Sequence, residues 1–295
     1  MTFSAFKKHK VVRLIARVAI GTVVLFAILV LSLLLFREPS NDRDWAFDQS
    51  ILPYAIFDGD IVTIKNIRNF SYASRNEYAP NYYDKTFDLR TIESVDYIVE
   101  PLASIAAAHT FLSFGFKNGD HVAISIEIRK EKGEEFSPFR ALVNEYEIMY
   151  VIVDERDTIQ LRAIHRDNPV YLYSAKVSPD KIRPLFVDIL ERANKLKEKP
   201  EFYNTLTNTC ATNIADHINN ISPGRISFDW RILLPLDSDQ FAYELGLIDN
   251  SLPFEEVRQK HLINDFIKEY ADDPDFSVKI REAQQRSLAN TDSSQ

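Results

Sequence analysis

Cys210 is the only cysteine among the 295 residues, and its neighbours are typical of a thiol at the start of a helix. Asn208 and Thr209, which precede it, are residue types that cap helix N-termini. Ile214 and Ile218, which follow it, fall at helical spacing. We therefore expect Cys210 in a first helical turn, where unpaired N–H groups and the helix dipole stabilise a thiolate. Such a thiol is a candidate nucleophile, and a small buried side chain is the ordinary alternative.

A cysteine nucleophile needs a histidine as base and a third polar group that orients the base. His109 and His121 stand at the starts of two predicted strands, and by elimination they are the best partners for Cys210. His217 follows Cys210 by seven residues, about 10 Å along a helix, which is too far for its base. The remaining histidines lie before the apolar segment, in a polar turn and on a late helix: His9, His165 and His261. Each strand histidine could equally be an ordinary, partly exposed side chain.

Two other chemistries use the same residues or their neighbours. His109, His121 and Cys210 with a carboxylate could bind zinc in tetrahedral geometry, although no HExxH motif is present. Glycoside hydrolysis needs two carboxylates that flank a sugar. Carboxylates are plentiful in the middle of the chain, where an acidic surface also explains them: Glu127, Glu145, Glu147, Asp154 and Asp157.

The elements that must position these residues form an α+β fold with an antiparallel sheet packed on helices. Two alternating runs, 109–116 and 121–129, flank Asn118-Gly119-Asp120 and predict a hairpin. Simple pairing places His121 nearer Phe116 than His109, so the histidines meet only if the first strand bends. Further strands are predicted at 61–67, 95–99, 148–153, 158–163 and 170–177. Helices are predicted from Ser178 to before Pro200, after Cys210, and around 238–248 and 253–270, and residues 68–92 are predicted to be an ordered loop or binding surface.

Residues 19–36 are uncharged, and with the apolar residues upstream they reach the ~20 residues that cross a bilayer core. Five basic residues precede the segment, so the positive-inside rule leaves the N-terminus in the cytoplasm and the body outside. A cleaved signal peptide and a buried core helix are the alternatives. The expected organisation is a basic N-terminus at 1–17, a transmembrane anchor at 18–36, a linker at 37–56, an extracytoplasmic domain at 57–271 and a disordered tail at 272–295.

Composition narrows the classes of function. The net charge is −8, and the chain after the basic N-terminus carries −13, which disfavours nucleic-acid binding. Only 7 glycines are present, and neither a GxGxxG motif nor a Walker-type motif occurs, so we expect no nucleotide cofactor. We also expect no metal and no other cofactor. A single cysteine excludes an intramolecular disulfide.

Several separated motifs agree in order with one family: HTFLSFGF, HVAISIEIRKEKGEEFSP, YVIVDERDTIQLR, FYNTLTNTCATNI and AYELGLID. Over roughly residues 90–255 the chain resembles the lacto-N-biosidase N-terminal periplasmic domain-like family, bacterial domains of unknown function that are often membrane-anchored. The resemblance implies a single-pass protein of the bacterial inner membrane with its C-terminal domain in the periplasm. The family commonly has Asn-Cys where this chain has Asn208-Thr209-Cys210.

The order of His109, His121 twelve residues later and Cys210 far downstream is also similar to circularly permuted papain-like hydrolases and acyltransferases, such as the lecithin:retinol acyltransferase group. This resemblance implies Cys210 as nucleophile, His109 as base and His121 as orienting group, brought together by a curved sheet. Asn208 and Thr209 would cap the helix whose N–H groups, beginning with that of Cys210, stabilise the oxyanion. Members of this group act on amide or ester bonds in peptidoglycan, peptides or lipids.

Two hypotheses follow. The first is a membrane-anchored thiol hydrolase or acyltransferase that acts on an envelope substrate through Cys210, His109 and His121. The second is a non-catalytic periplasmic binding or assembly domain, in which residues 68–92 form the binding surface.

Overall fold

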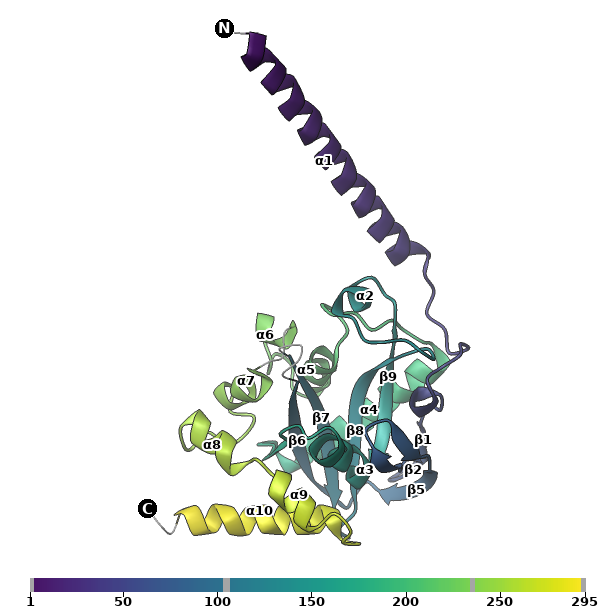
Figure 1. Ribbon diagram of the computed structural model, residues 1–295. Helices are drawn as coiled ribbons and strands as arrows, with labels where there is room; N and C mark the ends of the chain where they lie inside the picture. Colours follow the sequence, from purple (N-terminus) through teal and green to yellow (C-terminus); the bar gives the residue numbers. More distant parts are fainter. Residues whose placement is uncertain (1–2, 103–106, 234–236, 293–295) are drawn as a thin grey trace.

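The structure is a computed structural model that describes residues 3–102, 107–233 and 237–292 (Figure 1). Its first element, α1 (Phe3–Phe36), projects from a folded body. Within α1, Val12–Ser32 is long and apolar enough to cross a membrane, with a mean hydropathy of 2.7 and no residue buried against the body. In the described residues, one helix passes this test of length and composition.

A mixed sheet runs through the body in the order β1-β2-β9-β8-β7-β6-β10, and β5 pairs with β2. Its strands are β1 (Tyr54–Asp58), β2 (Ile61–Arg68), β5 (Tyr82–Asp88), β6 (Ile92–Leu102), β7 (Ala107–Phe116), β8 (His121–Arg129), β9 (Glu147–Asp154) and β10 (Tyr171–Ser174). All of these pairings are antiparallel except the one between β2 and β9. The predicted hairpin is confirmed as β7 and β8, with Gly115 opposite His121.

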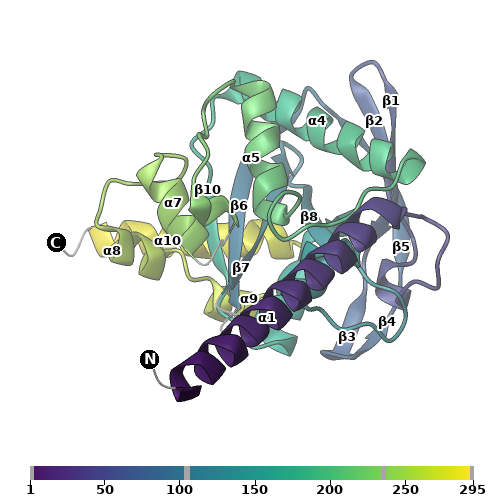
Figure 2. The same ribbon diagram turned by 90° about the horizontal axis from the view of Figure 1, so that it is seen from above.

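Helices cover both faces of the sheet (Figures 1 and 2). One face, which we call the α5 face, carries α4 (Pro179–Glu198) and α5 (Cys210–Ile221), and its core includes Phe114 and Phe186. The other, the α10 face, carries α3 (Glu155–Gln160), α9 (Asn264–Glu269) and α10 (Phe276–Asp292). The remaining helices are α2 (Pro138–Leu142), α6 (Trp230–Leu233), α7 (Ser238–Glu244) and α8 (Phe254–Lys260). The α+β class is confirmed, and α4 and α5 lie where helices were predicted.

Two segments differ from their prediction. Residues 158–163, predicted as a strand, belong to α3 and to a π-helical turn at Leu161–His165. Asp154 caps α3 by accepting a hydrogen bond from the Arg156 N–H, and the helical path turns both Asp157 and Arg162 into the protein. Residues 68–92, predicted as a loop, contain β5 and a small hairpin of β3 (Ser71–Ser74) and β4 (Glu77–Ala79). Their tyrosines pack against each other and against Phe70, so an apparently polar stretch forms its own aromatic cluster.

The C-terminal segment was predicted to be disordered, and this is wrong for residues 276–292, which form α10. Its apolar side chains Phe276, Ile280 and Ala283 lie one turn apart and are buried on the sheet. Arg281, on the same side of the helix, forms ion pairs with Asp96 and Glu155. A short apolar stripe and one arginine therefore hold a segment whose average composition is polar.

Candidate pocket beside Cys210

Cys210 is the first residue of α5, as the sequence predicts, and the start of the helix is firmly capped. The Thr209 hydroxyl accepts a hydrogen bond from the Thr212 N–H at 3.2 Å, and the Thr212 hydroxyl accepts one from the Thr209 N–H at 2.7 Å. Asn208 lies outside this cap, and its side chain joins Phe202 to Asn213 across the loop. Thr209 and Asn208 thus fix the position of Cys210 at the helix start.

The thiol of Cys210 is buried on the α5 face. Burial raises its pKa above the ordinary value, and this effect outweighs the hydrogen-bonding groups of Thr110 and of the Cys210 and Ala211 N–H groups, which lower it. The Thr110 hydroxyl makes no hydrogen bond of good geometry in the described residues, although it lies close enough to the Cys210 thiol and the Tyr97 hydroxyl to affect their pKa values. A protonated, buried thiol is the resting state at neutral pH.

His109 does not lie near this thiol, because it belongs to the other face of the sheet. Side chains alternate along β7, so Thr110 and Leu112 face α5 while His109 and Phe111 face α10. The His109 Nε2 atom lies 2.7 Å from the Ser125 hydroxyl and 3.7 Å from a Glu127 carboxylate oxygen. Burial and the nearby Arg162 guanidinium lower the pKa of His109 to about 4, which keeps the ring neutral.

His121 lies on the same α10 face but at the far end of the hairpin. It pairs with Gly115, six residues from His109 along β7, a separation of about 20 Å. Its Nδ1 atom is 2.9 Å from the Gly119 carbonyl oxygen, and burial lowers its pKa. The structure therefore does not bring Cys210, His109 and His121 together, either as a triad or as ligands of one zinc ion. The simple antiparallel pairing that separates the histidines is the pairing that the structure has.

The carboxylates that could have formed a glycosidase pair are engaged elsewhere. Each of the five holds a neighbouring arginine, tyrosine or backbone N–H: Glu127 with Arg162, Glu145 with Arg37, Glu147 with Arg43 and the Ser40 N–H, Asp154 with Tyr83, and Asp157 with Arg68. Among the described residues, none of them lines the pocket described next.

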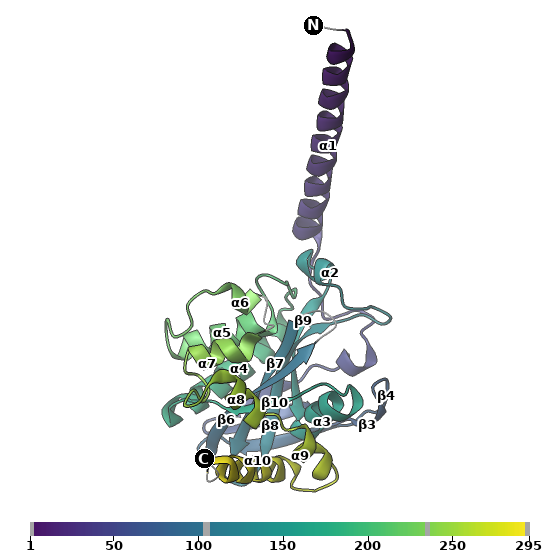
Figure 3. The ribbon, with the colours of Figure 1, turned by 60° about the vertical axis from the view of Figure 1, so that its left-hand side comes forward.

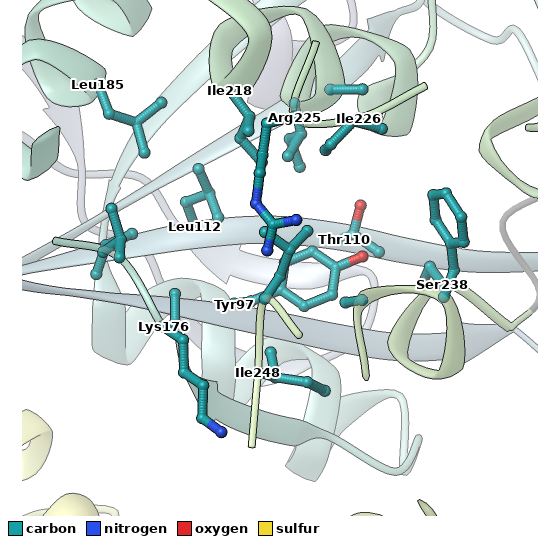
Figure 4. A pocket seen from close by; sticks show the side chains of 18 of the residues that line it. Tyr97, Thr110, Leu112, Lys176, Leu185, Ile218, Arg225, Ile226, Ser238 and Ile248 are labelled. Carbon is teal, nitrogen blue, oxygen red and sulfur yellow. The ribbon is translucent and has the colours of Figure 1, made fainter. Parts of the chain in front are cut away.

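A cavity of about 270 Å³ opens next to Cys210, between α5, α7 and the β6, β7 and β10 end of the sheet (Figure 4). Its walls are mainly apolar and come from segments far apart in the sequence: Val95, Leu112, Leu185, Ile214, Ala215, Ile218, Ile226, Ile232, Ala242 and Ile248. Thr110 and Ala211, the residues that contact the thiol, also line it. Cys210 thus lies behind the floor of the cavity.

Five residues with hydroxyl groups line this cavity: Tyr97, Thr110, Ser178, Ser222 and Ser238. Tyr97 and Thr110 point toward one another in Figure 4, and Ser238 lies on α7 at the same end. Thr110 and Ser238 are buried, and neither hydroxyl makes a hydrogen bond of good geometry in the described part of the chain, although both lie near the Tyr97 hydroxyl and oppose the rise that burial causes in its pKa. Since a buried hydroxyl without a well-formed hydrogen bond costs free energy, two of them on one cavity wall indicate a place where a ligand or water supplies the partner.

Four cationic side chains also line the cavity, and two of them are paired with carboxylates. Lys176 is 3.0 Å from Asp249, and Arg231 is 2.9 Å from Asp229. By contrast, Lys181 donates to the Ser222 hydroxyl at 2.7 Å, and Arg225 donates to the Leu245 carbonyl oxygen at 2.6 Å. Figure 4 shows Arg225 reaching into the cavity. Lys181 and Arg225 therefore bring positive charge to an otherwise apolar site.

A hydrogen-bonded network behind α5 holds this wall in place, and no sequence motif indicates it. The Tyr150 hydroxyl is 2.7 Å from His217 Nε2, and His217 Nδ1 is 2.6 Å from a carboxylate oxygen of Asp188 on α4. Tyr150 also donates to Asn213 at 3.1 Å. His217, which was set aside as a base for Cys210, instead joins α5 to the sheet and to α4.

Taken together, the chain is a mixed α+β body carried by one apolar helix, with an apolar pocket beside a buried cysteine. It matches the family of the Lnb N-terminal periplasmic domain over residues 78–236, just over half of its length, and it belongs to that family. The sequence motifs therefore indicated the correct family, although the match begins and ends earlier than 90–255. Neither curated proteins nor solved structures provide a match to this chain. A periplasmic domain behind an N-terminal apolar helix fits a single-pass membrane protein whose C-terminal body is periplasmic.

Proposed function

We propose that this protein is a binding domain, anchored in the inner membrane, whose pocket takes an acyl chain that ends in an acidic group. The observation that carries the proposal is the pocket itself, which combines apolar walls, buried hydroxyls without well-formed hydrogen bonds and the cations Lys181 and Arg225. A volume of about 270 Å³ is near the lower end for small-molecule sites and suits one chain rather than a whole diacyl lipid.

Each part of such a ligand has a counterpart in the site. The chain would displace water from the walls formed by α4, α5 and α7, which is the main source of free energy for an apolar ligand. The acidic group would accept hydrogen bonds from Lys181 and Arg225, whose present partners are neutral oxygens. The hydroxyls of Tyr97, Thr110 and Ser238 would bind a polar group on the chain or a bridging water.

Photo-crosslinking of the full-length protein in liposomes tests the proposal. A fatty acid that carries a diazirine is expected to label the α5 peptide that contains Ile214 and Ile218. Ala215→Phe fills the pocket and should abolish this label, whereas Ala289→Phe on the exposed side of α10 should not. Label confined to α1, or unchanged by Ala215→Phe, would show that the pocket is not the site.

The acidic end of the ligand is tested separately. The double variant K181A/R225A should reduce labelling by the fatty acid to the level obtained with a fatty alcohol of the same length. Equal labelling of the unaltered protein by acid and alcohol would contradict the role of the two cations. Thermal unfolding of each variant serves as the control for folding.

Acyl transfer at Cys210 is the second candidate, and it is favoured by the position of the thiol at the start of α5 next to the pocket. The permuted papain-like arrangement would accompany this chemistry. In this reaction, the Cys210 thiolate would attack an ester or amide carbonyl and form a thioester, and the leaving group would take up a proton. Water would then hydrolyse the thioester. Since His109 and His121 lie on the α10 face, another group would have to take the thiol proton, which places this candidate second.

The rate of alkylation of Cys210 by iodoacetamide, measured from pH 6 to pH 10, separates the two candidates. A thiol whose pKa is raised by burial should react slowly, with a rate that increases only above the ordinary thiol pKa of about 8.5. An inflection below that value would favour the nucleophile. Cys210→Ala gives the background rate.

A further inference from the structure

The end of α1 is attached to the body by specific contacts, so one side of the body is held toward the membrane. Arg37 donates to the Glu145 carboxylate and, at 3.3 Å, to the Asn144 carbonyl oxygen. Three residues on, the Ser40 N–H donates to Glu147 at 2.9 Å, and Arg43 lies 3.0 Å from the same carboxylate. A tether bound this closely does not let the body rotate freely under its anchor.

The side that faces the anchor carries exposed apolar side chains around α2. Phe136, Phe139 and Leu142 come from α2 and the residue stretch before it, and Leu206 comes from the loop before α5. The two segments are joined, because the Thr205 hydroxyl donates to the Pro138 carbonyl oxygen at 2.9 Å. The ring of Phe139 also stacks on Phe26 of α1, with ring centroids 6.5 Å apart. Because Phe26 lies inside the apolar segment of α1, Phe139 reaches the depth of that segment.

A second exposed apolar group lies at α6. Phe228 and Trp230 are 82% and 62% exposed, the most exposed aromatic side chains of the described body. Figures 1 and 3 place α6, like α2, at the end of the body from which α1 leaves, while α9 and α10 lie at the other end. We call these six residues the membrane face: Phe136, Phe139, Leu142, Leu206, Phe228 and Trp230.

We propose that the membrane face docks on the bilayer that α1 spans. Phenylalanine, leucine and tryptophan at the edge of a folded body are the side chains that insert at a membrane interface. The acidic net charge of the body gives no electrostatic attraction to anionic lipid, so the docking rests on apolar contact and on the short tether. Docking of the membrane face does not depend on the proposal that the pocket binds a ligand.

One consequence concerns the route into the pocket. Trp230 begins α6 on the membrane face, while its neighbours Arg231 and Ile232 line the cavity. The same short helix therefore separates the bilayer from the pocket. An acyl chain in the membrane would reach the pocket past α6 without crossing bulk water.

The two tryptophans of the chain allow a direct test with the full-length protein in phosphatidylcholine liposomes. Trp45 is buried, whereas Trp230 lies on the membrane face. Lipids brominated on their acyl chains should quench part of the tryptophan emission, and that part should disappear in Trp230→Phe. If Trp230 is quenched only by acrylamide in the water phase, the face is exposed to solvent and the proposal fails. If neither reagent quenches it, a protein or a second copy covers the face, and the proposal also fails.

Two leucines provide a matched pair of variants. Leu206, on the membrane face, is 47% exposed, and Leu262, two residues before the start of α9, is 41% exposed. Leu206→Ser should reduce the quenching of Trp230 by brominated lipid, whereas Leu262→Ser should leave it unchanged. Equal effects of the two would overturn the assignment of the face. Crosslinking of fatty acid to α5 is measured in parallel, so a failure of docking and a failure of the pocket are distinguished.

Discussion

The two faces of the central sheet differ in where their buried polar groups lie: both faces hold paired networks, such as Tyr150 with His217 on the α5 face, but the α5 face also has buried hydroxyls beside a cavity. On the α10 face, buried charged side chains form ion pairs, with Arg162 between Glu100 and Glu127 and Arg281 between Asp96 and Glu155, although Glu100 Oε2 and Arg162 Nε, 2.9 Å apart, lack hydrogen-bond geometry. On the α5 face, hydroxyls of Thr110 and Ser238 face a cavity and make no hydrogen bond of good geometry in the described residues. Paired charges stabilise the fold, whereas unpaired hydroxyls around a cavity can take a ligand or a water as partner. The face with fewer charges is therefore the better candidate for function.

Arg162→Met should give the largest effect, because it removes the cation between two buried carboxylates. We expect a loss of about 3–5 kcal/mol in the free energy of unfolding, a large part of the stability of a typical domain. Urea unfolding in nanodiscs, followed by near-UV circular dichroism, measures it. Arg90→Met, which breaks only an exposed pair with Asp88, should cost far less than Arg162→Met, because solvent screens the pair. If the two variants lost the same free energy of unfolding, the buried ion pairs of the α10 face would not be what stabilises the fold.

Ser113→Ala tests the same face with a smaller change. Ser113 is buried on β7 and donates a hydrogen bond to Glu155, which Arg281 also holds. Loss of a hydrogen bond to a charged group should cost about 1.5–3 kcal/mol. The same unfolding experiment measures it. A cost near zero would show that Arg281 alone satisfies the carboxylate.

His109→Gln should change how stability depends on pH. Burial and the charges of Arg162 and Arg166 lower the pKa of His109 from 6.5 to about 4, against the opposite effect of Glu127 and Glu100. Because the pKa of His109 is lowered in the folded protein, the unfolded chain binds the proton at a higher pH than the folded protein does. The contribution of the neutral His109 ring to the free energy of unfolding is therefore complete above pH 6.5 and is lost as the pH falls toward 4. The variant should therefore lose less stability than the unaltered protein between pH 6.5 and pH 4.

Unfolding free energies at several pH values check this prediction. His121, His217 and His261 also have pKa values lowered by burial, so the variant should flatten the dependence only in part. An unchanged slope would mean that the His109 ring is readily protonated in the folded protein.

Thr110→Val should have the smallest effect on stability, and it is the matched counterpart of Ser113→Ala on the same strand. The variant removes a buried hydroxyl that makes no hydrogen bond of good geometry and keeps the shape of the side chain. We expect the free energy of unfolding to change by less than about 0.5 kcal/mol. A loss as large as that of Ser113→Ala would show that the hydroxyl is paired within the protein, and the contrast between the faces would be broken.

Local patterns were enough to predict much of the fold. Asn118-Gly119-Asp120 between two alternating runs specifies the hairpin, and the apolar stripe from Ile182 to Leu196 specifies α4. Residues 158–163 were misassigned because alternating apolar and polar residues also suit a helix whose polar side is buried. Only contacts with distant carboxylates, such as that of Arg162 with Glu100, reveal that side. The disordered tail was misassigned because its apolar residues are few, though well spaced.

The candidate site was harder to predict, for a geometric reason. Alternation along β7 and β8 places His109 and His121 on one face, and this much could be read from the sequence. Tertiary packing decides which face of the sheet α5 covers. The face that α5 covers in turn decides whether the Cys210 thiol lies beside His109 or beside Thr110. The pocket was not predictable either, because its walls come from both strands and helices across residues 95–248.

The ion pairs of Arg281 also bear on how the protein is made. Asp96 and Arg281 are 185 residues apart, and the carboxylates of Asp96 and Glu155 are buried once α10 has docked. Export of a body behind an N-terminal anchor proceeds from the anchor onward, so α10 crosses after the segments that carry the two carboxylates. Until α10 has crossed and docked, Asp96 and Glu155 lack the cation that pairs with them. A chain stalled before Arg281 has crossed should therefore be cleaved by proteases faster than a chain in which α10 has docked.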